Sequence, residues 1–98
     1  MNWLLSQVAL AVDGRLTGPD VALSGVTTDT RAIAAGQLFI ALRGERFDAH
    51  DFLETAALSA AALMVADENK LPAGVSAVVV ADTRLALGRL AAAWRASF

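Results

Sequence analysis

Residues 38–52 read LFIALRGERFDAHDF. All of the first five side chains are apolar, so both faces of an extended segment here would be buried, as in the central strand of a layered sheet. Gly44 ends the strand, and residues 43–51 include six ionisable side chains, one of which is the only histidine of the chain. In open α/β sheets, ligands bind beside loops that leave the carboxyl ends of strands. The stretch therefore predicts a central strand that leads into a candidate binding loop.

Apolar residues at helical spacing predict three helices around this strand, over residues 5–12, about 49–59 and about 83–97. Gly14 is expected to end the first helix in the left-handed conformation, and Asp82 is expected to cap the last. The second and third helices each carry one apolar face, formed respectively by Phe52, Leu53, Ala56 and Ala57, and by Leu87, Leu90, Ala91, Trp94 and Phe98.

Short apolar runs predict buried strands over residues 62–66 and 77–81, and the β-branched run at 26–31 predicts an extended segment. Short extended pieces flank the turn at Gly18. The resulting order is α, β, β, β, α, β, β, α. We expect one small layered α/β domain with a mixed β-sheet flanked by helices.

The composition excludes several classes of protein. The net charge is −2, which argues against a nucleic-acid surface. Seven arginines accompany a single lysine, and arginine suits forked contacts with carboxylate or phosphate. Without cysteine the chain has neither disulfides nor thiolate metal sites. No signal peptide and no bilayer-length apolar run is present, so we expect a soluble domain.

The acids of the charged stretch have a structural interpretation. Asp48 lies at a helix N-cap position, and Asp51 follows where the acid of a capping box would stand. A metal-binding or catalytic carboxylate pair is the alternative, but no further ligand follows at suitable spacing. His50 is expected to hydrogen-bond a neighbouring loop. The sequence thus predicts no catalytic residue and no metal site.

The loop Gly44-Glu45-Arg46-Phe47 has two interpretations. Arg46 offers a positive fork and Phe47 a flat apolar face, which together suit an anionic ligand with a planar ring. Alternatively, Phe47 packs under the loop while Arg46 pairs with Glu45 or Asp48. The residues alone leave both interpretations open.

A second polar cluster occupies residues 27–31, TTDTR. On a strand, the hydroxyls of Thr28 and Thr30 would share one face and could bond the edge of a heterocycle. Asp29 and Arg31 would share the other face and brace each other or the Arg46 loop. The threonines are equally consistent with simple strand propensity. No GxxxxGK[ST] phosphate loop is present, so the residues indicate at most a binding domain.

The chain resembles the amino-terminal domain of the Mur ligases of peptidoglycan synthesis in two segments, TTDTRAIAAGQLFIALRGERFDAHDF (27–52) and DTRLALGRLAAAWR (82–95). The first segment matches a pattern shared by the MurE and MurF branches of the family. Its end, GERFDAHDF, and the second segment together are most similar to MurF. The resemblance extends from Leu5 to Arg95. Thr30 replaces a common serine and Ala49 a frequent glycine, and neither change threatens the site.

The resemblance implies a single domain, residues 1–98, that binds the UDP part of a UDP-N-acetylmuramoyl peptide. By position, the family's UDP contacts fall on Thr28, Thr30, Glu45, Arg46 and Phe47. The residues expected to support them are Asp29, Arg31, Asp48 and His50. The resemblance assigns no metal and no cofactor to this domain.

For the whole enzyme, the resemblance implies a cytoplasmic ligase whose central domain binds ATP and Mg²⁺ and whose carboxyl-terminal domain presents D-Ala-D-Ala. The tripeptide carboxyl would be activated as an acyl phosphate. Both further domains are expected beyond this chain, which should be inactive alone. Two alternatives remain: a MurE-type domain that serves addition of a single amino acid, and a non-enzymatic interaction domain of the same fold.

Overall fold

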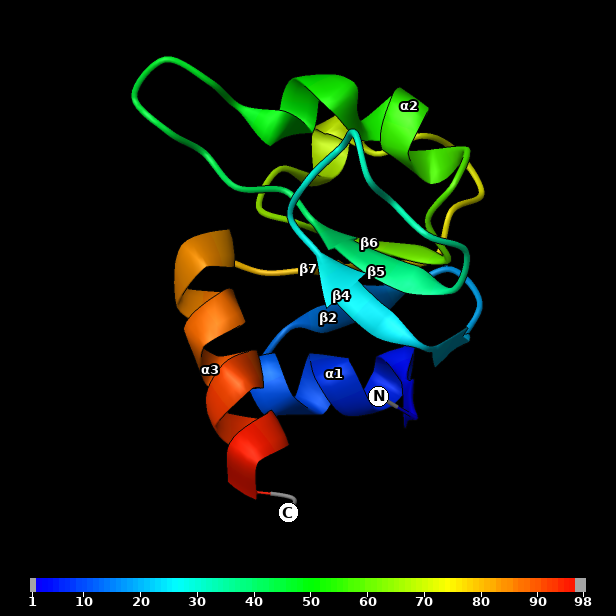
Figure 1. Cartoon of the computed structure of the whole chain (residues 1–98), viewed down its shortest axis with the longest axis vertical. Helices are drawn as coiled ribbons and strands as arrows, with labels where there is room; N and C mark the ends of the chain where they lie inside the picture. Colours follow the sequence, from blue (N-terminus) through cyan, green and yellow to red (C-terminus); the bar gives the residue numbers. More distant parts are fainter. Residues whose placement is uncertain (1, 97–98) are drawn as a thin grey trace.

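A computed structural model describes residues 2–96 and contains a central sheet between two helical layers (Figure 1). Its elements are β1 (Trp3–Leu4), α1 (Leu5–Val12), β2 (Arg15–Thr17), β3 (Ala22–Leu23), β4 (Gly25–Thr27), β5 (Gln37–Ile40), the 3₁₀ helix η1 (Ala49–Phe52), α2 (Leu53–Ala57), β6 (Ala62–Val65), the 3₁₀ helix η2 (Glu68–Lys70), β7 (Ala77–Val79) and α3 (Thr83–Ala96).

The main sheet has the strand order β2-β7-β6-β5-β4. Strands β4 to β7 pair in parallel, and β2 joins the edge antiparallel to β7. The predicted mixed sheet is therefore confirmed. A second, two-stranded sheet pairs β1 with β3. Because β4, β5, β6 and β7 run in one direction, their carboxyl ends meet at a single edge of the sheet.

Strand β5 is buried on both faces, as its sequence predicts. Leu38 and Ile40 pack into a core shared with α1 and α3, whereas Phe39 and Ala41 pack into a second core under η1 and α2. All four side chains have no exposed surface. In Figure 1, α1 and α3 accordingly cover one face of the sheet and α2 lies over the other.

The first helix ends differently from the prediction. Asp13, not Gly14, adopts the left-handed conformation, with φ of 56°. The Gly14 N–H bonds the Ala9 carbonyl at 2.8 Å, which completes the turn around Asp13. Gly14 has a packing role instead, because a Cβ there would lie 2.5 Å from Cγ1 of Val78.

The second helix is also shorter and tighter than predicted, because residues 49–52 form a 3₁₀ turn and the α-helix ends at Ala57. Leu53 and Ala56 are buried and Ala57 is partly buried, as expected. Phe52 is 43% exposed, so its assignment to the buried face was wrong. Because a 3₁₀ helix has only three residues per turn, the Phe52 side chain does not line up with the buried side chains of α2, which begin at Leu53.

The last helix begins as predicted. The Asp82 carboxylate accepts the backbone N–H groups of Arg84 and Leu85 at 2.9 and 3.1 Å, which is an N-cap. Leu90 is buried, and Leu87 packs against the same core. Phe98, placed by prediction on this stripe, lies outside the described residues. Across residues 2–96, no helix is both long and apolar enough to cross a membrane.

We predict opposite effects of two glycine-to-alanine substitutions. Gly14→Ala should lower the free energy of unfolding by about 1–3 kcal/mol, because the new methyl collides with the Val78 side chain. Gly88→Ala should raise it by about 0.5–1 kcal/mol, since Gly88 lies inside α3 with nothing within 4 Å of its Cβ position. Urea unfolding of the two variants measures both. Equal effects would contradict the packing role of Gly14.

Candidate functional site

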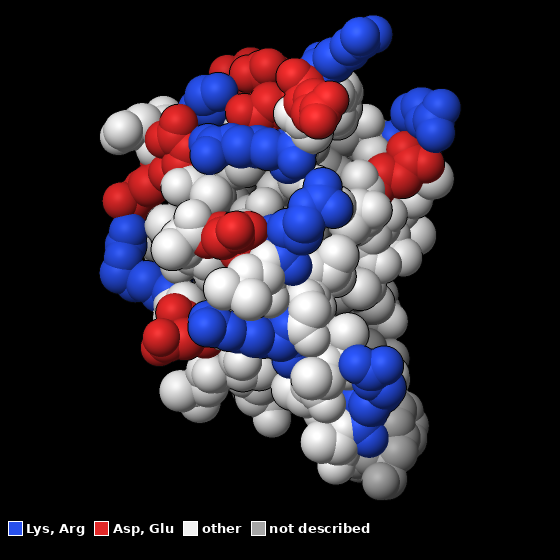
Figure 2. All heavy atoms as spheres, turned by 90° about the vertical axis from the view of Figure 1, so that its left-hand side faces the viewer, with Lys and Arg blue, Asp and Glu red and all other residues white. Residues whose placement is uncertain are grey.

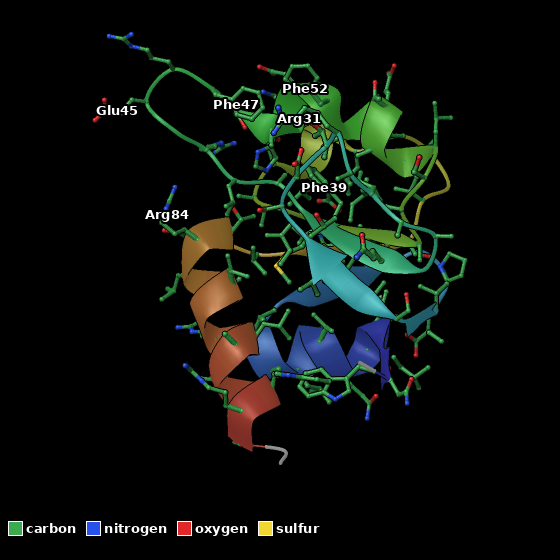
Figure 3. All side chains as sticks on the ribbon, viewed as in Figure 1. Arg31, Phe39, Glu45, Phe47, Phe52 and Arg84 are labelled. Carbon is green, nitrogen blue, oxygen red and sulfur yellow. The ribbon has the colours of Figure 1, made fainter. Side chains whose placement is uncertain are left out.

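The two polar clusters predicted from the sequence lie at the same edge of the sheet. Residues 28–31 follow β4, and the charged stretch follows β5, the strand to which β4 pairs in parallel. Ile33, from the first loop, packs into the core beneath η1, which ties the two loops to one layer. Figure 3 shows Arg31 and Phe47 at this end of the molecule.

The predicted extended segment 26–31 is correct only as far as Thr27, where β4 ends. The Asp29 carboxylate accepts the backbone N–H of Arg31 at 2.9 Å, and the Asp29 N–H donates to the Thr27 hydroxyl. Such side-chain bonds to the local backbone replace strand pairing with a turn. Thr28 and Thr30 therefore do not form a row on one face of a strand, although both remain at the end of β4.

Asp29 and Arg31 brace each other, one of the two predicted possibilities. The Arg31 Nε and Nη2 donate to the two oxygens of Asp29 at 3.1 and 3.4 Å. These contacts lower the pKa of Asp29 and raise that of Arg31. Since both groups are exposed, the pair chiefly fixes the shape of the turn.

The charged stretch forms a narrow hairpin between Arg43 and Asp48. These two residues form an antiparallel bridge, the Gly44 N–H donates to the Phe47 carbonyl at 2.6 Å, and Arg43 Nε donates to Asp48 at 3.2 Å. Glu45 and Arg46 lie at the exposed tip. In Figure 3 the Glu45 side chain points away from the sheet.

Phe47 stacks on Phe52, with ring centroids 5.4 Å apart and planes 18° apart. The two rings remain 54% and 43% exposed. Among residues 2–96, Arg46 forms no ion pair, and Asp48 instead pairs with Arg43 and, more distantly, Lys70. The alternative in which Phe47 packs under the loop and Arg46 is neutralised is therefore wrong. An aromatic platform and a free guanidinium face solvent together.

Asp48 and His50 hold the base of the hairpin to the sheet. Asp48 caps η1 by accepting the His50 N–H at 2.9 Å and also bonds Nδ1 of the same ring at 2.7 Å. Nε2 of His50 accepts the N–H of Ala66, just after β6, at 2.9 Å. The ring is buried, and because Nε2 accepts a backbone N–H, the ring proton is assigned to Nδ1, which faces Asp48. The predicted capping and loop-bonding roles of these residues are confirmed.

Partial burial raises the pKa of Asp48, but hydrogen bonds from the His50 N–H, the His50 ring and Arg43 outweigh it and lower the pKa to about 2. Asp51 makes no reciprocal capping bond and pairs with Lys70 at 3.2 Å. Within residues 2–96, no three His, Asp or Glu side chains are grouped as a metal site would require.

Sequence reasoning missed a polar hollow of about 260 Å³ where β6 and β7 end. It is lined by Arg43, Ala66, Ala81, Asp82, Thr83 and Arg84. A signal was available, since Asp-Thr-Arg occurs at residues 29–31 and again at 82–84. In both copies the aspartate accepts the arginine N–H at 2.9 Å, and both copies follow a parallel strand.

Figure 2 views the side of the molecule that lies to the left in Figure 1, where Figure 3 draws Arg84 and Glu45. Basic and acidic side chains alternate across it. This surface therefore has no single-sign field that would suit a nucleic acid, and any anion must be held by specific donors.

Comparison with known proteins identifies the family. Residues 22–95 match the family described as "Mur ligase family, catalytic domain". The chain belongs to the Mur ligase family. It is 51% identical, over 90% of its length, to the UDP-N-acetylmuramoyl-tripeptide--D-alanyl-D-alanine ligase of Escherichia coli K12. It is 39% identical, over 85% of its length, to the UDP-N-acetylmuramoyl-L-alanyl-D-glutamate--2,6-diaminopimelate ligase of Geobacter sulfurreducens.

The fold gives the same result. A crystal structure of MurF from Acinetobacter baumannii superposes with a TM-score of 0.83 at 35% identity, covering 94% of this chain and 21% of that chain. The predicted resemblance to Mur ligases, and to MurF in particular, is confirmed. The chain spans 19% of the Escherichia coli ligase and 16% of the Geobacter sulfurreducens ligase.

We predict that Asp48→Asn lowers the free energy of unfolding by about 1–2 kcal/mol near pH 7, because an amide loses the charge-assisted bonds to Arg43 and His50. The folded-state pKa of Asp48 lies below its ordinary value. The contribution of the Asp48 charge to the free energy of unfolding is therefore complete above about pH 5 and disappears as the pH falls toward 2. Urea unfolding of the wild-type and variant proteins between pH 2.5 and 7 measures the difference.

Asp51→Asn is the matched control. It removes an exposed partner of Lys70 from the same turn and should change stability by less than about 0.5 kcal/mol. A stability difference between the wild-type protein and Asp48→Asn that stays constant down to pH 2.5 would show that the Asp48 charge is not responsible.

Proposed function

We propose that this chain is the domain of a MurF-type ligase that binds the UDP end of UDP-N-acetylmuramoyl-tripeptide while D-Ala-D-Ala is added. The proposed contacts are Thr28, Thr30, Glu45, Arg46 and Phe47. Asp29, Arg31, Asp48 and His50 hold the two loops in shape and make no proposed contact with the ligand.

One observation carries this proposal: both polar clusters follow the carboxyl ends of adjacent parallel strands, β4 and β5. Ligands of open α/β sheets bind at such ends. The exposed face of Phe47 suits a uracil ring, and the threonine hydroxyls suit its polar edge. Arg46, which forms no ion pair within residues 2–96, suits phosphate. The 51% identity to a ligase named for a UDP-linked substrate supports the same ligand.

The bond-forming chemistry of the proposed enzyme belongs outside this chain. The sequence has no glycine-rich phosphate loop, and residues 2–96 contain no carboxylate cluster suited to a metal ion. These residues do not fit ATP and Mg²⁺, which the whole ligase would hold in its central domain for activation of the tripeptide carboxyl. This domain would contribute binding energy and position to a group far from the reacting carbon.

A MurE-type ligase is the second candidate, since a diaminopimelate-adding relative is 39% identical over 85% of this chain. Both candidates require the same UDP contacts, because the relatives' names share the UDP-N-acetylmuramoyl group and differ in the residue added. The sequence that follows residue 98 in the gene distinguishes them. A non-enzymatic interaction domain would instead leave the UDP contacts without a ligand.

We predict that UDP added to the ¹⁵N-labelled chain shifts the amide signals of Thr28, Thr30 and residues 44–47. Arg46→Ala should weaken UDP binding roughly tenfold or more, through loss of a charge-assisted contact. Arg95→Ala removes the same charge from the exposed last turn of α3 and should leave the affinity unchanged. In the complete ligase, Arg46→Ala should raise KM for the nucleotide substrate and preserve kcat.

Absence of any shift at millimolar UDP would favour the non-enzymatic alternative. A collapse of kcat at saturating substrate, with KM unchanged, would contradict a purely anchoring role for Arg46.

A further inference from the structure

We propose that the hollow beside Arg43, Thr83 and Arg84 is a phosphate subsite that receives the diphosphate of the nucleotide bound by the hairpin. This inference rests on the proposed UDP-binding function and extends it to residues outside the two clusters. Arg46 would meet the diphosphate from the tip of the hairpin, whereas Arg43 and Arg84 would meet it from the strand ends.

Thr83 is the observation that points to a ligand. Only 4% of the residue is exposed, and it lines the hollow at the first turn of α3. Its hydroxyl has no hydrogen-bond partner among the residues that the structure describes. Every fully buried side-chain oxygen in residues 2–96 has a hydrogen-bond partner, so the unpartnered Thr83 hydroxyl is not fully buried. The small surface that Thr83 retains therefore includes this hydroxyl. A hydroxyl placed in this way is available to donate to a ligand in the hollow.

The two arginines are held in place without using most of their donors. Arg84 Nη2 donates to the Arg43 carbonyl at 3.3 Å, and Arg43 Nε donates to Asp48 at 3.2 Å. Each guanidinium has five N–H donors, so most of them remain available. The contact between Arg84 and Arg43 also joins the start of α3 to the base of the hairpin. Figure 3 shows the Arg84 side chain extending from the start of α3 on the side where the hairpin lies.

The nearby carboxylates do not cancel the preference of the hollow for an anionic ligand. Asp48 bonds His50 and Arg43, and one oxygen of Asp82 bonds the two N-terminal amides of α3. The second Asp82 oxygen has no partner among residues 2–96, but the two guanidinium groups and the Thr83 hydroxyl supply more free donors than this oxygen supplies acceptors. The ionised oxygens of a diphosphate only accept hydrogen bonds, and the start of a 14-residue helix adds partial positive charge.

The position of the hollow selects the diphosphate as its occupant. Arg43 lines the hollow and begins the hairpin that carries Arg46 and Phe47. We therefore place the phosphates of a nucleotide whose ring lies against Phe47 at the base of the same hairpin. The volume of about 260 Å³ is sufficient for phosphate groups but small for a complete nucleotide.

The test compares uridine, UMP, UDP and inorganic phosphate as ligands of the 98-residue chain, by calorimetry and amide shifts. The wild-type chain should bind UDP at least tenfold more tightly than uridine, and UDP but not uridine should shift the amides of Thr83 and Arg84. Thr83→Val and Arg84→Gln should each weaken UDP binding, by several-fold and roughly tenfold, and leave uridine binding unchanged. Thr83→Ser, which keeps the hydroxyl, and Arg95→Gln, which removes a charge elsewhere on α3, should bind UDP normally.

Equal affinities for uridine and UDP, or UDP binding unaffected by both Thr83→Val and Arg84→Gln, would overturn the phosphate subsite and leave the uridine site intact. Binding of inorganic phosphate at Thr83 and Arg84 as tight as that of UDP would show a general anion site and overturn its link to the nucleotide. Failure of both uridine and UDP to bind would refute the proposed function itself. Amide spectra of each variant establish that it is folded before its affinities are compared.

Discussion

Parallel pairing of β4, β5, β6 and β7 is the constraint on which the remaining structure depends. Each parallel connection must return the chain to the opposite edge before the next strand begins, so all four strands end on one side. The polar residues that follow these strands are distant in sequence and meet at this edge. It is where the chain gathers the turn of Asp29, the hairpin of Arg46, the Ala66 amide that His50 binds, and the start of α3.

The sequence predicted the layered core well because burial of both faces of a strand appears in the sequence as a run of apolar residues. Five consecutive apolar residues require cover on both faces, and Leu38 and Phe39 do pack into opposite cores. The loops were predicted less well because single hydrogen bonds determine their shape. Asp29 converts an apparent strand of threonines into a turn, and Asp13 takes the left-handed position that composition assigns to glycine. Propensity alone does not weigh one such bond against an extended conformation.

The candidate site, too, could be predicted only in part from the sequence. Residue types left Arg46 and Phe47 open between a ligand role and a structural role. Only the coordinates show that Phe52 extends the aromatic surface and that Asp48 already bonds Arg43. Thr83 and Arg84 escaped notice because a capped helix start is complete without a ligand. Their proposed role depends on Arg43, which lies 41 residues before Arg84 and whose carbonyl accepts a bond from it.

The buried His50 explains how the exposed hairpin of the proposed UDP site is held to the sheet. Its Nδ1 holds Asp48 at the hairpin base, while its Nε2 accepts the Ala66 amide at the end of β6. A displacement of the hairpin base would therefore break bonds to a central strand or leave a buried imidazole nitrogen without a partner, which is costly. Binding energy obtained far from a reacting centre helps only if the frame between them is stiff. The imidazole holds the base of the exposed hairpin to the sheet, so under the proposed function this histidine would have a positioning role.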